Sequence, residues 1–347
     1  LLARIYLNAA VYRDPYGTPN FTAADMDAVI QYTNQVINSG EHALSAEYFE
    51  IFDDENHTNK ELIFAIDQRP DLDGHNRMAY FSMSGDFYPL PEFPSANGTD
   101  AAAITPDFYQ TWVDAYGDVD PADADPRFHK DINEPGCVSA EDFEVDRGIY
   151  RGLLYGLQHD QGGDPFERCD GDNYVVDLVV NRRSEVGDPV FHSLEIDFTT
   201  NSSHSNGYRV LKYEFSKTSD SGRNKGQADL VVLRLADMYL MRAEAALRKG
   251  DAGAALADVN FVRASRTARH TAPALDEMNL DLLYRERGFE FYWEFQRRTD
   301  MIRFGKYEDS YTEKTNSDPQ KRLFPIPQSA VDGASILDGY LVQNAGY

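Results

Sequence analysis

The sequence predicts a mainly α-helical protein, in which tetratricopeptide-like helical hairpins carry a long loop-rich insertion with a few short strands. Two observations lead to this prediction. Residues 229–306 place apolar side chains at helical spacing over successive segments. Residues 69–225 are instead dominated by Pro, Gly, Asp, Asn and Ser, interrupted by short apolar runs. A chain of 347 residues is long enough to bury a large core around such a frame.

The first helix of the main helical region is expected over residues 229–249, because small or apolar residues recur there every three or four positions. These residues are Leu233, Ala236, Leu240, Ala243 and Leu247. Gly250 suits a left-handed helix end, and Asp251 suits the cap of a second helix over residues 252–266. Alanines in both segments allow close approach, so an antiparallel pair of the tetratricopeptide type is predicted.

A third helix is expected over residues 280–306, where apolar side chains lie on nearly all sides, as in a buried helix. Charged residues are nevertheless interleaved with them. Glu286, Glu290 and Glu294 lie one turn apart, and Arg287 and Arg298 fall within reach along the same helix. Because an unpaired buried charge costs several kcal/mol, we expect a network of Arg–carboxylate bonds here.

The N-terminal region predicts a second helical hairpin. Residues 1–12 have a helical pattern, Thr22 suits the cap of a helix over residues 23–39, and Gly40 suits its end. Residues 61–68 follow as a short strand or extended segment. The predicted organisation is one domain with four regions: helical hairpin 1–68, loop-rich and ligand-facing 69–225, helical hairpin plus buried helix 226–306, and extended C-terminal segment 307–347.

Within the loop-rich region, Thr105 and Pro106 predict the start of a helix over residues 107–116. Trp112 on this helix is expected in the core. Short apolar runs predict strands at residues 175–181, 194–198 and 208–215. Loop of this length on a helical frame is typical of ligand-binding regions.

Residues 78–94 are the strongest candidate for ligand contact, because aromatic residues crowd a segment whose Gly and Pro prevent a regular helix. The candidate binding residues are Tyr80, Phe81, Asp86, Phe87, Tyr88 and Phe93. Exposed rings offer flat apolar surfaces to the C–H face of a pyranose, and neighbouring polar groups bond its hydroxyls. The alternative is that these rings only hold the loop against the helices.

Charge and motif content exclude several classes of function. The chain has 33 Lys and Arg against 58 Asp and Glu, a net charge of −25, so it repels nucleic acid and anionic membranes. Its eight histidines form no metal-binding set, and no phosphate loop or nucleophile motif is present. We therefore predict no cofactor, no metal and no catalytic residue.

Two further features leave alternatives open. Asp118, Asp120, Asp123 and Asp125 suggest a calcium loop, but Ala122 stands where an oxygen ligand is needed, which favours a solvated loop. The two cysteines, Cys137 and Cys169, form a disulfide in an exported protein or remain as free thiols in a reducing compartment.

Four blocks carry a resemblance to a known family: residues 234–263, residues 285–306, LFPIPQSAV at 323–331, and the terminal LVQNAGY at 341–347. In this order they resemble the C-terminal half of the SusD/RagB family, nutrient-binding outer-membrane lipoproteins of Bacteroidetes-type bacteria. The resemblance implies that Asp125-Pro126-Arg127 is a structural turn. Because residues 1–12 resemble the middle of a helix, a lipid-bearing N-terminal part is expected to precede them.

The resemblance also implies a function. Such a protein binds oligosaccharide or polysaccharide on the extracellular face of the outer membrane, without catalysis, and works with a TonB-dependent SusC-like barrel in nutrient uptake. One alternative is a helical glycoside hydrolase, which requires two carboxylates ~5–10 Å apart in an open cleft and free of arginine partners. A second alternative is a tetratricopeptide-type scaffold for protein interaction.

Overall fold

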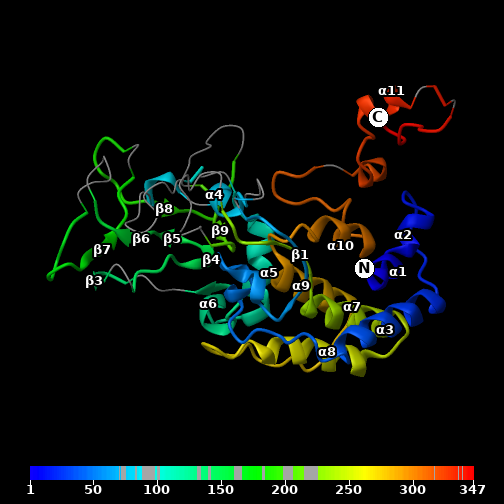
Figure 1. Ribbon diagram of the computed structural model, residues 1–347, viewed down its shortest axis with the longest axis horizontal. Helices are drawn as coiled ribbons and strands as arrows, with labels where there is room; N and C mark the ends of the chain where they lie inside the picture. Colours follow the sequence, from blue (N-terminus) through cyan, green and yellow to red (C-terminus); the bar gives the residue numbers. More distant parts are fainter. Residues whose placement is uncertain are drawn as a thin grey trace.

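The computed structural model describes residues 1–69, 71, 76–82, 84–87, 98–99, 102–130, 134–139, 142–159, 166–181, 184–197, 206–214, 226–315, 317–334, 336–337 and 339–347. The protein is mainly helical, as predicted. Figure 1 shows the long helices gathered at one end, the small sheets at the other, and the C-terminal segment projecting beyond α10 (Arg297–Arg303). Among the described helices, none is both long enough and apolar enough to cross a membrane.

Tetratricopeptide-like hairpins form the helical end of the molecule. Helix α3 (Ala23–Ile37) packs between α1 (Leu2–Leu7) and α7 (Leu235–Arg248), and α8 (Ala252–Ser265) packs on the other side of α7. The short α2 (Ala9–Arg13) follows α1 after a break at Asn8. The helix boundaries predicted at Thr22, Gly40, Gly250 and Asp251 are confirmed.

The confirmed ends are made by caps and glycines. Thr22 accepts a hydrogen bond from the Asp25 amide, and Asp251 accepts one from the Ala254 amide. Gly40 and Gly250 have φ values of 71° and 87°, which a glycine adopts without steric cost.

The first helix of the main region begins later than predicted. Residues Leu230–Arg234 form strand β10, which pairs antiparallel with β1 (Leu62–Ile66). The helical spacing of Leu233 was therefore misleading. A run of Val and Leu accepts either structure, and the nearby strand at Leu62–Ile66 supplied the partner that made the extended form stable.

The third predicted helix is interrupted. Helix α9 (Leu280–Phe291) ends before Tyr292, and α10 follows after a turn. Trp293 and Phe295 in this turn have φ values of 62° and 61°, in the left-handed region that bulky residues avoid. The prediction of one helix to residue 306 was wrong because nothing in the local sequence signals this turn.

The loop-rich region contains short helices and small antiparallel sheets. Its helices are α4 (Met78–Ser82), α5 (Pro106–Tyr116) and α6 (Pro121–Ala124). Its strands are β2 (His129–Lys130), β3 (Gly136–Val138), β4 (Arg147–Tyr150), β5 (Gly152–Leu153), β6 (Tyr155–Leu157), β7 (Tyr174–Leu178), β8 (Phe191–His192) and β9 (Arg209–Leu211). The sheets have the strand orders β2-β4-β9, β3-β7-β6 and β5-β8.

The structure moves one predicted strand and shows that the two cysteines are bonded to each other. The strand predicted at residues 194–198 lies earlier, as β8, because the backbone at Phe191–His192 pairs with β5. The strands predicted at 175–181 and 208–215 are present as β7 and β9. Thr105 caps α5 through the Phe108 amide, as predicted. A disulfide joins Cys137 to Cys169.

Shorter elements complete the chain. They are the 3₁₀ helices Phe49–Phe52, Asn56–Thr58, Gly85–Phe87 and Pro319–Arg322, and the C-terminal α11 (Gln328–Gly333). The core between α5, α9 and the central strands is rich in aromatic rings. Trp112 is fully buried and stacks on Phe289 with ring centroids 3.6 Å apart, which confirms its predicted place in the core.

The acidic side chains on one side of α9 and just after it, Glu286, Glu290 and Glu294, are buried in an ion-pair network. Arg263 contacts Glu286 at 2.8 Å, Arg234 contacts Glu290 at 2.6 Å, and Lys212 contacts Glu294 at 2.5 Å. The network consists of five basic and five acidic buried side chains: Arg127, Lys212, Arg234, Arg263, Arg266, Glu61, Asp125, Glu286, Glu290 and Glu294. The buried charges therefore balance within the cluster.

The predicted network is confirmed, but its arginines come from other segments. Arg287 points to a different side of α9 and pairs with Asp237 and Asp300. Arg298 lies beyond the end of α9 and bonds the Lys321 carbonyl. Pairing within one helix was the wrong expectation, because the chain ends the helix at Phe291 and buries its acidic side against neighbouring elements.

Candidate functional site

An open, mostly apolar pocket of about 980 Å³ lies where several segments meet. The segments are α4, Ala102 before α5, the end of α9 with the turn that follows it, the start of α10 and the C-terminal segment. The lining residues are Met78, Phe81, Ala102, Phe291, Trp293, Phe295, Arg297, Arg298, Thr299 and Phe324. We call this the aromatic pocket. Its size and its exposed rings make it the strongest candidate for ligand binding in the described part of the chain.

Two rings of the aromatic pocket come from the strained turn between α9 and α10. Phe295 remains 67% exposed, so packing in this structure does not explain its left-handed backbone. Trp293 is half-buried, and its indole Nε1 is buried with no hydrogen-bond partner among the residues that the structure describes. A bulky residue with positive φ costs about 1–2 kcal/mol. Strain of this kind collects at functional sites, where it presents a side chain that a relaxed backbone would not.

Phe81 on α4 is the candidate binding residue that lines the aromatic pocket. Its ring is 39% exposed, and the Arg77 guanidinium lies 4.8 Å from the ring centroid. The Tyr80 ring lies 5.5 Å from the Phe81 ring and also contacts Arg77. Arg77 thus covers part of the ring pair and leaves an exposed surface on Phe81.

The other candidate residues of this stretch have different positions. Asp86 is 3% exposed, and its carboxylate accepts a hydrogen bond from Ser84. Phe87 lies at the end of the 3₁₀ helix Gly85–Phe87. Tyr88 and Phe93 lie outside the described residues.

Phe324 closes the aromatic pocket from the C-terminal segment. It is 69% exposed, and the Arg298 guanidinium lies 4.0 Å from its ring centroid. Arg298 also donates from Nη2 to the Lys321 carbonyl at 2.6 Å. This contact holds the C-terminal segment against α10, so Arg298 fixes the position of Phe324.

Sequence reasoning missed Trp293, Phe295 and Phe324. The first two were assigned to a buried helix, where aromatic side chains have a packing role. Phe324 belongs to LFPIPQSAV, whose prolines predict only an extended backbone. The available signal was Pro325 directly after Phe324, because a residue before proline is disfavoured in a helix.

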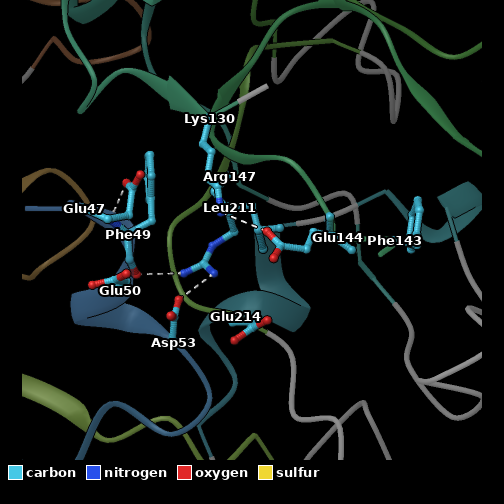
Figure 2. A pocket seen from close by; sticks show the side chains of 11 residues that line it. Glu47, Phe49, Glu50, Asp53, Lys130, Phe143, Glu144, Arg147, Leu211 and Glu214 are labelled. Atoms are coloured by element: carbon cyan, nitrogen blue, oxygen red, sulfur yellow. Dashed lines mark hydrogen bonds and ion pairs between the residues drawn. The ribbon is translucent and has the colours of Figure 1, made fainter. Parts of the chain in front are cut away.

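A second, smaller hollow of about 160 Å³ is lined by five acidic residues among those described, Glu47, Glu50, Asp53, Glu144 and Glu214 (Figure 2). Arg147 occupies its centre, donates to Asp53 at 3.1 Å and also bonds backbone carbonyls. Burial raises the pKa of Asp53 to about 6, although Arg147 opposes this shift. Glu50 and Glu214 lie close by in the same hollow. A carboxyl group with a raised pKa resembles a general acid, but this one has an arginine partner.

Asp120, Asp125 and Glu286, which lie outside this hollow, have structural roles. Asp120 caps α6, and Asp125 accepts two hydrogen bonds from the Arg127 side chain. Burial raises the pKa of Glu286, but Arg263 and Arg127 outweigh it and lower that pKa. The stripe on α9 is therefore unsuited to donate protons. Within the described ranges, no group of three or more His, Cys, Asp or Glu residues could hold a metal ion.

Tetratricopeptide-like helix pairs, small antiparallel sheets and the aromatic pocket define a helical protein with a candidate ligand pocket. The chain belongs to the SusD family, whose model matches residues 51–347. It is 25% identical to the starch-binding protein SusD of Bacteroides thetaiotaomicron, over 98% of this chain and 55% of that protein. The chain thus spans about half the length of this curated relative.

Solved structures show the same fold. A SusD superfamily protein from Bacteroides fragilis matches all of this chain and 63% of its own length, with a TM-score of 0.58 and 17% identity. The surface glycan-binding protein A of Bacteroides thetaiotaomicron in complex with laminarihexaose matches 99% of this chain and 62% of its own length, with a TM-score of 0.55 and 18% identity. These similarities establish the fold.

Proposed function

We propose that this protein binds glycans at the cell surface and acts in nutrient uptake, without breaking glycosidic bonds. It works with a TonB-dependent SusC-like barrel and is lipid-anchored on the extracellular face of the outer membrane. The single observation that carries glycan binding is the aromatic pocket, with exposed rings on segments from different parts of the chain. The names of the relatives, a starch-binding protein and a surface glycan-binding protein, support it.

Binding in this proposal needs only stacking and hydrogen bonds. The rings of Phe81, Phe295 and Phe324 are each more than one-third exposed and cover the C–H faces of sugar rings. Because the pocket is open, water fills it in the free state and is displaced from the rings by the sugar. An open site also releases its ligand readily, which suits transfer to a transporter.

Replacing Phe295 separates ligand affinity from stability. We expect Phe295→Ala and Phe295→Gly to weaken glycan binding by about tenfold, because each removes a stacking ring. Phe295→Gly is expected to be more stable than Phe295→Ala by about 1 kcal/mol, because glycine relieves the strain at a φ of 61°. Affinity electrophoresis against starch, laminarin, xylan, galactan, polygalacturonate and alginate measures binding, and urea denaturation measures stability.

Phe261→Ala is the matched control for these variants. Phe261 is 54% exposed on α8 and does not line the aromatic pocket, so its removal should leave glycan retardation unchanged. Equal retardation of the Phe295 variants and the unaltered protein would rule out stacking by this ring. If none of the polysaccharides retards the unaltered protein, glycan binding itself is wrong.

The glycoside hydrolase alternative has one specific observation in its favour, the raised pKa of Asp53 beside Glu50 and Glu214. We expect no release of reducing ends from the same polysaccharides, because Arg147 holds the Asp53 carboxylate and the hollow is small. A reducing-sugar assay on the unaltered protein and on Asp53→Asn tests this. Activity that disappears in Asp53→Asn would place a hydrolytic site in this hollow.

A further inference from the structure

We propose that the aromatic pocket selects glycans that carry a carboxylate, a uronic acid residue, and that Arg297 and Arg298 bind this carboxylate. This inference rests on the proposed glycan-binding function and adds the substrate class. The named relatives are described with neutral glucans, starch or laminarihexaose, so the inference departs from them.

The charged side chains among the described residues of the aromatic pocket are both arginines. Arg297 and Arg298 line it, and the described part of its lining includes no Asp or Glu. This contrasts with a chain whose net charge is −25, and with the hollow around Arg147, whose described lining includes five carboxylates. A pocket with two cations and no anion in a strongly acidic protein favours an anionic ligand.

These two arginines differ from the other buried arginines of α9 and α10. Arg287 pairs with Asp300 at 2.9 Å, and Arg303 pairs with Glu244 at 2.8 Å. Among the described residues, the recorded hydrogen bonds of Arg297 and Arg298 go to carbonyl and phenol oxygens and to no carboxylate. Each guanidinium can therefore still donate hydrogen bonds to a ligand carboxylate, although the charge of Asp300 also acts on Arg297.

Arg297 is held in place from two sides. Its guanidinium lies 3.6 Å from the centroid of the Tyr284 ring, and Nη1 donates to the Tyr284 carbonyl at 2.8 Å. Gly288 makes room for it, because a Cβ there would lie 3.0 Å from Nη1. Burial lowers the pKa of Arg297, although an arginine remains charged. A partly desolvated cation with Nε and Nη2 unused in the described structure is prepared for a carboxylate.

Arg298 places a second guanidinium next to a sugar-stacking ring. It lies on the Phe324 ring and uses Nη2 for the Tyr307 hydroxyl and the Lys321 carbonyl. Its Nε and Nη1 have no hydrogen-bond partner among the described residues. A uronic acid carries its carboxylate on the pyranose ring, so a sugar stacked on Phe324 or Phe295 brings that carboxylate to the adjacent guanidinium groups.

The net negative charge of the chain does not exclude an acidic ligand. Interactions between exposed charges are largely screened beyond ~8 Å at physiological salt. A carboxylate inside the pocket therefore responds mainly to the two lining arginines, which are close to it and partly shielded from water. The remaining charge slows the approach of a long acidic polysaccharide more than it weakens the bound state.

Calorimetric titration at 150 mM salt tests this proposal with hexamers of galacturonate, glucuronate and mannuronate. Each hexamer is compared with the neutral hexamer obtained by reducing its carboxyl groups. We expect at least one uronate hexamer to bind at least tenfold more tightly than its reduced form. If a neutral hexamer binds and no uronate exceeds its own reduced form tenfold, the inference is wrong and glycan binding stands. If no charged or neutral glycan binds, the proposed function fails as well.

Variants assign the preference to the two arginines. The double variant Arg297→Gln/Arg298→Gln should remove the tenfold preference. The preference is measured as the ratio of the affinity for a uronate hexamer to the affinity for its reduced form. A loss of ring stacking lowers both affinities and leaves this ratio unchanged. Arg298→Lys should retain part of the preference, because lysine keeps the positive charge but lacks the planar guanidinium that forms two parallel hydrogen bonds to a carboxylate. Lys249→Gln is the matched control, since it removes one exposed positive charge at the end of α7. A preference that survives in the double variant would refute the assignment.

Discussion

Glu290→Gln is expected to destabilise the protein by about 3–5 kcal/mol, the cost of breaking a buried ion pair by removing one partner. Glu290 is fully buried, and its two oxygens accept hydrogen bonds from Arg234 and Arg266 at 2.6 Å and from Arg127 at 3.1 Å. Glutamine keeps the shape but turns one oxygen into an amino group and leaves one buried positive charge uncompensated. A loss of this size is a large fraction of the 5–15 kcal/mol that is typical of folded proteins.

Urea denaturation at pH 7, followed by far-ultraviolet circular dichroism, measures this effect. Glu144→Gln is the control, because Glu144 is exposed and pairs with Lys130 at 2.8 Å. A surface pair of this kind contributes ~0–1 kcal/mol. If both variants unfold at the same urea concentration as the unaltered protein, the network does not hold α9 in place. If Glu290→Gln fails to fold, Arg266→Lys replaces it. Lysine keeps the positive charge but cannot form the two parallel hydrogen bonds of a guanidinium, so a smaller loss of stability is expected.

Stability is expected to fall steeply in acid, at pH values below about 4.5. Burial raises the pKa of Glu244, but Arg303 and Arg248 outweigh it and lower that pKa to about 2. Burial likewise raises the pKa of Asp237, but Arg4 and Arg287 outweigh it and lower that pKa to about 2. Both groups thus release their protons more readily in the folded protein than in the unfolded chain.

The direction of the pH effect follows from these lowered values. Above the ordinary carboxyl pKa near 4 both states are ionised, and the full stabilisation is present. As the pH falls toward 2, the unfolded chain binds protons first, and the stabilisation is lost. Each group contributes about 2–3 kcal/mol, at 1.36 kcal/mol per unit of pKa difference. Urea midpoints at pH 7, 5, 4 and 3 follow this loss.

Glu244→Gln is the variant that isolates one of these contributions. It should be less stable than the unaltered protein at pH 7, and its stability should depend less on pH between 5 and 3. Glu308→Gln serves as the control, since Glu308 pairs with Arg322 away from the buried clusters and is partly exposed. A variant at Glu244 whose pH dependence equals that of the unaltered protein would show that this carboxylate is not responsible.

The candidate site was predictable in part. Phe81 stood out because it belongs to an aromatic segment that Gly and Pro keep out of a regular helix, and it lines the pocket. Trp293 and Phe295 could not be recognised, since their sequence continues the pattern of a buried helix. Their positions in the pocket depend on left-handed backbone at both residues, which local propensity disfavours. Phe324 is held at the pocket by its contact with Arg298. Both residues are far from α4 in the sequence, so no local pattern predicts that they share a pocket with Phe81.

The sequence by itself determined the helical frame and the need for buried ion pairs. Helix caps such as Thr22 and Asp251, the periodic alanines of α7 and α8, and charges on an otherwise apolar helix are local features with local causes. Only the tertiary structure decided which arginines meet the α9 carboxylates, where that helix ends, and that rings from α4, the turn and the C-terminal segment share one pocket. These outcomes depend on contacts between residues far apart in the chain, and a pattern within one segment contains no information on its partner.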